Sequence, residues 1–386
     1  MSRTILFLFV LSTLALAHHG GAEYDLGKTV EFKAKLTKVD LINPHAWLYF
    51  DVTENDGKVS HHRCEMRSVH VLRRSGWTKE LFPVGQQITI EASPNRTDPA
   101  SCYLQTILTA DGTRMDRYGQ YIKGSQGLQE VRGPIVAPKN NRPSRRSTGE
   151  PNLAGDWAPI QQVMVNPRGT GGGLVSLNTL DQYKSGERPA NAGAGKAKGG
   201  AAPKGPRLYG GTELTEAGEK AAADFKREDT PRFHCETTSV LFDWTFDGPV
   251  NRITQNKDTI VLEYGQFGLK RTLFMNLKEH PGNIRPSRAG HSIGRWEGDT
   301  LVVETAGFLP GFLNTPVRNS DKLHVVERFS LDPDKMALTR NYVAEDPVYL
   351  KGKYTGSDTI FVADAPYSPG KCRELNFIDY SKQQKQ

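Results

Sequence analysis

The sequence predicts a mainly β protein with two domains, a small barrel followed by a larger antiparallel barrel or sandwich. Two regions, residues 24–120 and the residues from 232 onwards, contain short segments in which apolar and polar residues alternate. Alternation with a period of two is typical of strands that bury one face. Clusters of Gly, Pro, Asn and Asp separate these segments and indicate turns. Stretches rich in Pro, Arg, Gly and Lys lie between the two regions and predict a linker and a disordered insertion.

Residues 1–17 have the pattern of a signal peptide. Arg3 gives the start a positive charge, and the apolar run 5–16 is shorter than the roughly 20 residues that a transmembrane helix needs. Ala15 and Ala17 match the small residues that signal peptidase requires. We therefore expect cleavage after Ala17, no transmembrane segment in the mature chain, and a periplasmic or secreted location.

The cysteines fit an exported protein. None of the four lies in a Cys-x-x-Cys motif, and disulfides are the default for cysteines in an oxidising compartment. Four cysteines permit three pairings, and their spacing favours one bond in each domain. The expected bonds are Cys64–Cys102 and Cys235–Cys372.

Residues 18–122 are expected to form the first domain. A short helical segment at 69–75 lies between the third and fourth of five alternating segments. Five short strands with one helix in the middle predict an OB-like barrel. The strands are expected at 29–40, 46–52, 59–66, 86–92 and 103–109.

Residues 123–150 are expected to be a linker, and residues 151–380 the second domain. This domain contains an insertion at about 168–211 whose low-complexity sequence predicts disorder. A helix is expected from 214 to about 227, with Thr215 as its N-cap. About eight strands follow and predict an antiparallel, lipocalin-like barrel or a sandwich, and a closed barrel of that size can hold one small ligand. Among these strands are 259–264, 271–277, 292–296, 300–305, 323–330 and 337–343.

Several motifs resemble those of an uncharacterised class of exported bacterial proteins. His18-His19-Gly20, Asn43-Pro44-His45 and the Gly76-Trp77 pair resemble its N-terminal module, in which the mature chain begins Ala-His-His-Ser; Gly20 stands here in place of that Ser. Residues 290–305, which read GHSIGRWEGDTLVVET, resemble the C-terminal module of similar secreted proteins. The resemblance implies two domains and export from a bacterial cell, and it implies no particular activity.

The net charge of +7 does not predict nucleic-acid binding. Most of the excess of Lys and Arg over Asp and Glu lies in residues 123–210, which are largely linker and insertion. A nucleic-acid-binding domain needs a basic stripe on a folded surface. We therefore expect a small-molecule ligand and no nucleic-acid partner.

The processed N-terminus is a candidate metal site. Cleavage frees the α-amine of His18, which can chelate a metal together with its own imidazole, and His19 and His45 offer further imidazoles. Imidazole nitrogen is a good ligand for copper and zinc. The alternative is that the N-terminal histidines form a tail that binds no metal.

Four residues of the second domain are candidate catalytic groups. Arg271 and Glu327 alternate with apolar residues along their strands, Glu304 shares a face with Val302, and His291 begins a strand. A desolvated carboxylate can act as a general acid or base near neutral pH. The alternative is a buried Arg–carboxylate pair that serves the structure.

Three functions follow from these residues. The first is an exported small-molecule-binding protein, with its ligand in the second domain. The second is a copper- or zinc-binding protein that uses the processed N-terminus. The third is an enzyme without an organic cofactor, such as a hydrolase, lyase or isomerase. The first and third both require a cavity in the second domain that contains the four candidate catalytic side chains.

Overall fold

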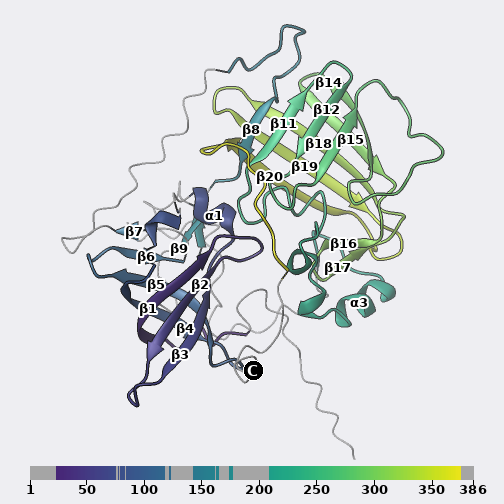
Figure 1. Cartoon of the computed structure of the whole chain (residues 1–386). Coiled ribbons are helices and arrows are strands. Elements are labelled where there is room, and N and C mark those ends of the chain that lie inside the picture. The colour runs from purple at the N-terminus through teal and green to yellow at the C-terminus, as the bar shows by residue number, and fades with distance from the viewer. Residues whose placement is uncertain are drawn as a thin grey trace, which may run out of the picture.

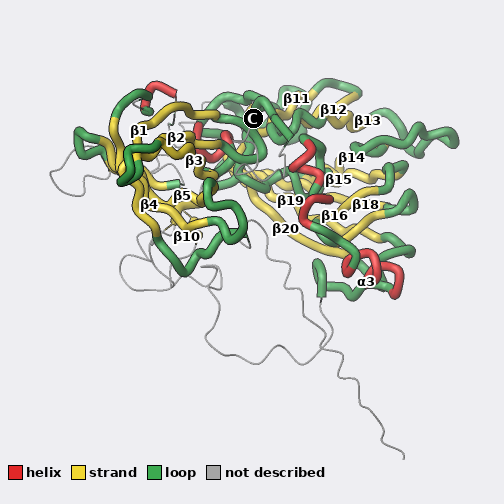
Figure 2. Tube along the Cα trace, turned by 60° about the horizontal axis from the view of Figure 1, so that its bottom comes forward, coloured by secondary structure: helices red, strands yellow, loops and turns green. Residues whose placement is uncertain are grey.

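The computed structural model describes two β-barrels that lie beside each other (Figure 1). The described residues are 23–74, 77, 79–82, 84–117, 121–122, 142–160, 162–164, 174–176 and 208–374. Helices are short and lie at the edges of the two barrels (Figure 2).

The first barrel has the strand order β3-β2-β1-β4-β5 and is closed by a parallel pairing of β3 with β5. Its helix α1 lies between β3 and β4, so the predicted OB-like barrel is confirmed. Two short strands, β6 and β7, extend the sheet beyond β5. The elements are β1 (Val30–Asp40), β2 (Trp47–Thr53), β3 (Val59–Glu65), α1 (Val69–Arg74), a 3-10 helix (Lys79–Leu81), β4 (Gln87–Pro94), β5 (Ser101–Thr109), β6 (Arg114–Asp116) and β7 (Tyr121–Ile122).

The first disulfide lies on the closing strand pair. Cys64 of β3 is directly opposite Cys102 of β5 in the parallel register, and the two sulfurs are bonded as predicted. Both cysteines belong to the buried apolar core of this barrel, together with Leu48, Phe50 and Trp77. The alternation that predicted the strands therefore directs these side chains into a single core.

The second barrel is closed by nine strands within the described residues. All neighbouring strands are antiparallel except β13 and β14, which pair in parallel. A closed ring with an odd number of strands needs such a pair, so the predicted antiparallel barrel is confirmed with this one departure. In order around the ring, the strands are β11 (Asn251–Gln255), β12 (Thr259–Glu263), β13 (Lys270–Phe274), β14 (His291–Glu297), β15 (Thr300–Ala306), β18 (His324–Asp332), β19 (Ala337–Glu345), β20 (Tyr354–Val362) and β8 (Gly155–Ala158).

Shorter elements surround the second barrel. Thr215 caps helix α3 as predicted, because its hydroxyl accepts a hydrogen bond from the Gly218 amide, but the helix ends at Ala223 rather than near 227. Strand β10 falls inside the insertion predicted at 168–211, so three residues of that range are ordered as a strand; most of the range lies outside the described residues. The elements are β9 (Gln162–Met164), β10 (Leu174–Ser176), α3 (Glu216–Ala223), 3-10 helices Arg227–Asp229 and Pro231–His234, β16 (Gly311–Asn314) and β17 (Val317–Asn319).

A buried carboxylate joins the two barrels. Asp247 accepts hydrogen bonds from Arg67 of the first domain (2.5 Å) and from Arg232 of the second (2.7 Å). Burial raises the pKa of Asp247, but the two guanidinium groups outweigh burial and hold that pKa below its ordinary value. Asp247 is therefore ionised at neutral pH and carries the charge that both arginines need.

The C-terminal segment returns to the first domain after β20 (yellow in Figure 1). The Asn43 amide donates to the Lys371 carbonyl (2.9 Å), and the Arg373 amide donates to the Asn43 carbonyl (3.1 Å). The predicted Cys235–Cys372 bond is present, and it fastens this returning segment beside the first domain rather than within the second barrel.

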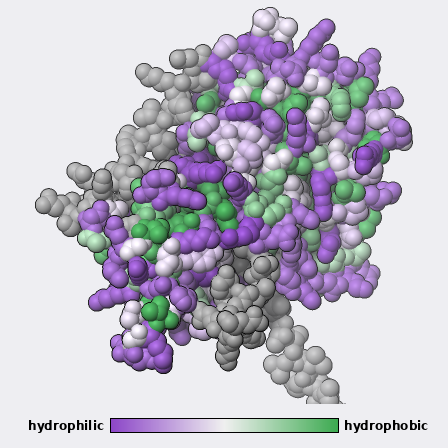
Figure 3. Space-filling model, viewed as in Figure 1, coloured by the Kyte–Doolittle hydropathy of each residue, from purple (hydrophilic) through white to green (hydrophobic). Residues whose placement is uncertain are grey.

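The face of the molecule shown in Figure 3 is largely hydrophilic, and polar residues interrupt its apolar patches. Among the helices of the described residues, none has both the length and the apolar character needed to cross a membrane.

We predict that Asp247→Asn lowers the free energy of unfolding by about 3–5 kcal/mol, because it takes the Asp247 charge away from the buried Arg232 guanidinium and the part-buried Arg67 guanidinium. Equilibrium urea unfolding measures this loss. The matched control is Asp321→Asn, which removes an exposed ion pair with Lys322 and costs less than about 1 kcal/mol. Equal losses in the two variants would contradict the role assigned to Asp247.

Candidate functional site

Two of the four predicted catalytic residues meet inside the second barrel. The Arg271 and Glu327 side chains are 1% and 0% exposed and form an ion pair. Arg340 of β19 donates to the other oxygen of Glu327 (3.2 Å) and to Asp358 of β20 (2.5 Å). Glu327 is thus held between two guanidinium groups in the barrel interior.

Most of the remaining donors of this network have partners, although the buried Nη1 of Arg271 has none. Arg271 donates from Nε to the Ser292 hydroxyl (2.9 Å) and from Nη2 to the Thr305 hydroxyl (2.6 Å). Arg340 donates to the Val240 and Leu241 carbonyls. Apolar residues of the core fill the barrel around the network. Paired charges and apolar side chains therefore occupy the described interior around Glu327.

Glu327 is not poised as a general acid. Burial raises its pKa, but Arg271 and Arg340 outweigh burial and hold the pKa below its ordinary value. An acid that works near neutral pH needs the opposite shift. The geometry thus favours the structural ion pair, which was the alternative interpretation of these residues.

The other two predicted catalytic residues lie on the outer face of the barrel. Ser292, not its neighbour His291, points inward to Arg271, because adjacent strand residues face opposite sides. Glu304 is 37% exposed and pairs with His324 (3.0 Å), while His291 meets His280 (2.8 Å between their Nδ1 atoms). The expectation that all four residues line one cavity is therefore wrong, since the strands separate them into an inner and an outer pair.

His45, the described member of the predicted metal site, has a carboxylate partner. Its Nδ1 lies 3.0 Å from Glu65, which also accepts a hydrogen bond from the Tyr24 hydroxyl (2.9 Å). The ring of Phe233 from the second domain meets the imidazole edge-on. His18 and His19 lie outside the described residues. No three His, Cys, Asp or Glu side chains in the described part of the chain stand around a common metal position.

A groove opens at the rim of the second barrel and has a cavity volume of about 560 Å³. Arg252 forms a two-bond fork to Asp156 (2.7 and 3.0 Å) at its wall. The Tyr367 amide also donates to Asp156, and the Tyr367 ring lies against the Arg252 guanidinium. We call this site the rim groove; it is lined by Arg142, Gly155, Asp156, Arg252 and residues 362–366.

Gly155 gives the rim groove its shape. Its φ of +127° is a conformation that other residues rarely adopt, and a Cβ at this position would overlap the Arg142 guanidinium. A glycine therefore lets Arg142 lie directly over the end of β8, against the ring of Trp157.

Charged groups of both signs meet around the rim groove. Asp364 in its wall pairs with Arg74 of α1 (2.8 Å), so the first domain contributes a guanidinium to the same site. Three arginines and two aspartates thus meet here, and the Glu263 carboxylate also acts on Arg252. Burial raises the pKa of Asp156, but Arg252 and the Tyr367 amide lower that pKa by a larger amount. The Asp156 carboxylate is therefore ionised at neutral pH.

Sequence reasoning missed several of these groups for different reasons. Arg340 shares the buried face of β19 with Leu338, the same signal that identified Arg271, so alternation was sufficient to find it. His280 lies in an irregular loop, and Asp156, Arg252 and Asp364 come from distant segments, so no local pattern joins them.

Comparison with known proteins identifies only the first domain. Residues 7–102 match a family of unknown function, DUF6152. The match spans β1 to the start of β5, about a quarter of the chain, and includes the Asn43-Pro44-His45 motif. Neither the curated proteins nor the solved structures gave a match. The expected likeness of the first domain to an uncharacterised family is therefore confirmed, and it carries no activity.

A second buried carboxylate lies near the domain junction. Asp243 is fully buried and accepts hydrogen bonds from the Thr238 amide (2.6 Å) and the Ser239 amide (3.2 Å). Burial raises the pKa of Asp243 to about 7, against the lowering effect of Arg232 and these amides. The carboxyl group is therefore largely protonated in the folded protein at mildly acidic pH.

We predict that Glu327→Gln destabilises the protein by about 3–5 kcal/mol, because Gln keeps the shape but leaves Arg271 and Arg340 without the charge between them. Urea unfolding measures the change. The control is Glu297→Gln, which removes an exposed carboxylate that also lies between two arginines. This control should cost less than about 1 kcal/mol. A small effect at Glu327 would show that its charge is unimportant in the barrel.

Asp243 gives a pH-dependent prediction. The pKa of Asp243 is higher in the folded than in the unfolded protein, so protonated Asp243 stabilises the fold. This stabilisation is fully present below about pH 4 and is lost as the pH rises to about 7. The loss amounts to up to about 4 kcal/mol of the free energy of unfolding. Asp243→Asn, which resembles the protonated acid, should flatten this decline when urea unfolding is measured between pH 4.5 and 7.5. An unchanged pH profile would mean that Asp243 titrates normally.

Proposed function

We propose that this protein is an exported, two-domain binding protein that takes a small anionic molecule, such as a carboxylate, in the rim groove. The observation that carries the proposal is that Arg142 and Arg252 both line the groove, while Arg74 pairs with Asp364 of its wall from the domain junction. The groove has a volume within the range of about 300–1,000 Å³ that ligand pockets show, and it is shallow and open to solvent, so a ligand would lie against its wall rather than be enclosed.

The lining suits one carboxylate with an apolar body. Arg252 uses Nε and Nη2 in its fork to Asp156, so its Nη1 end is directed away from that pair. A guanidinium group presents five N–H donors in a plane and binds carboxylates in pairs of hydrogen bonds. Val362, Ala363 and Pro366 supply apolar surface beside these donors.

Export is supported by the disulfides and by the N-terminal sequence. Disulfides persist in oxidising compartments, so the two bonds indicate a location outside the cytoplasm. The charged start, apolar run and small residues of 1–17 add the expectation of a signal peptide and a periplasmic or secreted destination. The packed barrel interior moves the predicted ligand from the centre of the second domain to its rim.

Arg252→Ala should weaken the binding of small carboxylates about tenfold or more, because it removes a charged donor from the groove wall. Isothermal titration with succinate, glutarate and benzoate measures the affinity on the full chain. The control is Arg295→Ala, which removes an exposed arginine from an ion pair on the barrel surface. Wild-type protein that binds none of the three probes, or Arg252→Ala protein that binds them normally, would overturn the proposal.

A further inference from the structure

Three histidines and a glutamate gather on the outer face of the second barrel. We call His280, His291, Glu304 and His324 the outer histidine cluster. The group draws on a loop and three different strands, β14, β15 and β18, so only the folded barrel brings it together. It contains three of the ten histidines of the chain and lies apart from the residues of the rim groove.

The strand register places the cluster around one small residue. His291 of β14 is paired with Ala306 of β15. Thr305 is paired with Val325, so the next position along puts Ala306 opposite His324 of β18. His291 and His324 therefore lie on either side of Ala306, roughly 10 Å apart at their backbones. The methyl group of Ala306 leaves the space between the two imidazoles open, and Glu304 is the next residue of β15 on the same face.

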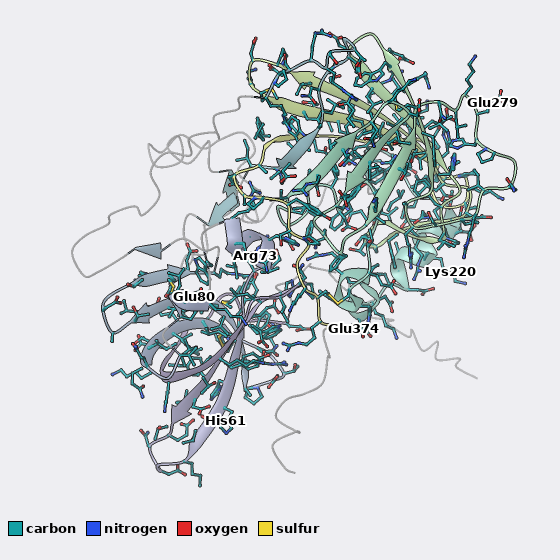
Figure 4. All side chains as sticks on the ribbon, turned by 45° about the horizontal axis from the view of Figure 1, so that its top comes forward. His61, Arg73, Glu80, Lys220, Glu279 and Glu374 are labelled. Atoms are coloured by element: carbon teal, nitrogen blue, oxygen red, sulfur yellow. A yellow bond between two sulfur atoms is a disulfide. The ribbon has the colours of Figure 1, made fainter. Side chains whose placement is uncertain are left out.

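The crossover loop supplies the fourth side chain. A parallel strand pair needs a long connection, and residues 275–290 make it between β13 and β14. Glu279 of this loop lies at the edge of the second barrel farthest from the first domain (Figure 4). The following residue, His280, turns its ring back to His291, and its Nε2 is buried without a hydrogen-bond partner.

The donor atoms stand in two close pairs. The Nδ1 atoms of His280 and His291 are 2.8 Å apart, a distance that needs at least one neutral ring. Burial lowers the pKa of both rings. The second pair is His324 with Glu304 at 3.0 Å. Neutral imidazoles and an ionised carboxylate are the protonation states in which these side chains bind metals.

We propose that the outer histidine cluster is a binding site for a late first-row divalent metal ion, with His280 and His291 as the first ligands and His324 and Glu304 completing the set. Three imidazoles and one carboxylate suit Zn²⁺ and Cu²⁺, and Cu²⁺ is expected to bind more tightly. Open water positions would leave such an ion accessible from the surface.

The metal-free arrangement must change before it can hold an ion. In the described part of the chain no three such donors already converge on one point, so the two pairs must turn toward each other. Two ligands of a tetrahedral ion lie about 3.3–3.4 Å apart when each bond is about 2.0–2.1 Å. The two Nδ1 atoms therefore separate by only about 0.6 Å, and His324 exchanges its contact with Glu304 for the ion.

Stability alone is a weak reason for this grouping. An exposed ion pair such as His324–Glu304 contributes about 0–1 kcal/mol. A ring pair that buries an unpartnered nitrogen adds a desolvation cost. The first domain offers a comparison in His61 and Asp51, an exposed pair at 2.6 Å.

The experiment is titration of the full chain with CuCl₂ and with ZnCl₂, followed by calorimetry and by metal analysis after gel filtration. His280→Ala and His324→Ala should each lower the affinity of one equivalent of metal about tenfold or more. His61→Ala, which removes a histidine at the far end of the other domain (Figure 4), should leave that equivalent unchanged. Circular dichroism in EDTA checks that each variant is folded, and His280→Gln in the loop replaces any variant that is not.

The outcomes separate this site from the other two ligand sites. Metal that binds equally well to wild type and to both cluster variants would overturn the proposal and assign the ion to another site, such as the processed N-terminus. Absence of Cu²⁺ and Zn²⁺ binding in the wild type would also overturn it. Carboxylate binding to the rim groove tests the proposed function separately, because neither cluster variant alters that groove.

Discussion

The ion network around Glu327 is the constraint on which the second domain depends. One buried carboxylate lies between Arg271 and Arg340, and the surrounding strands and the 240–241 turn supply most of the other partners of the two arginines. Charge pairs and apolar side chains then occupy the described barrel centre, and the two ligand sites that we propose lie at the rim and on the outer wall. The odd number of strands in this ring has a second consequence. It requires one parallel pair, β13 with β14, and the long loop that connects these two strands carries His280 to the outer wall.

Much of the fold could be predicted from the sequence because its signals are local. Alternation located most strands, and the hydroxyl of Thr215 marked the start of α3. Cysteine spacing gave both disulfides, although the place of Cys372 beside Asn43 depends on a return of the chain that no local pattern shows. The parallel pair was also missed, because strand pairing is decided by the closure of the whole ring rather than by any one segment.

The candidate sites were predictable only in part. Alternation showed that Arg271 and Glu327 lie on apolar faces, and the structure joins them. The same signal does not tell which face points inward where both faces carry apolar residues, as in Thr300–Ala306. Val302 on the outer side of β15 is as buried as Val303 on the inner side, so Glu304 was assigned to the interior with Val302. Burial of both faces thus removes the information that period two normally supplies.

The contact between the domains also sets the character of the rim groove. Arg74 leaves the first barrel, donates to the Gly248 and Pro159 carbonyls, and pairs with Asp364 in the groove wall. Its side chain is 6% exposed, so its charge is directed almost entirely into the junction. Asp247, the residue before Gly248, also links the two domains because it accepts a hydrogen bond from Arg67 of the first domain. Loss of domain contact would therefore take the Arg74 charge away from Asp364 in the groove wall, so the charge of the groove depends on how the first domain is docked.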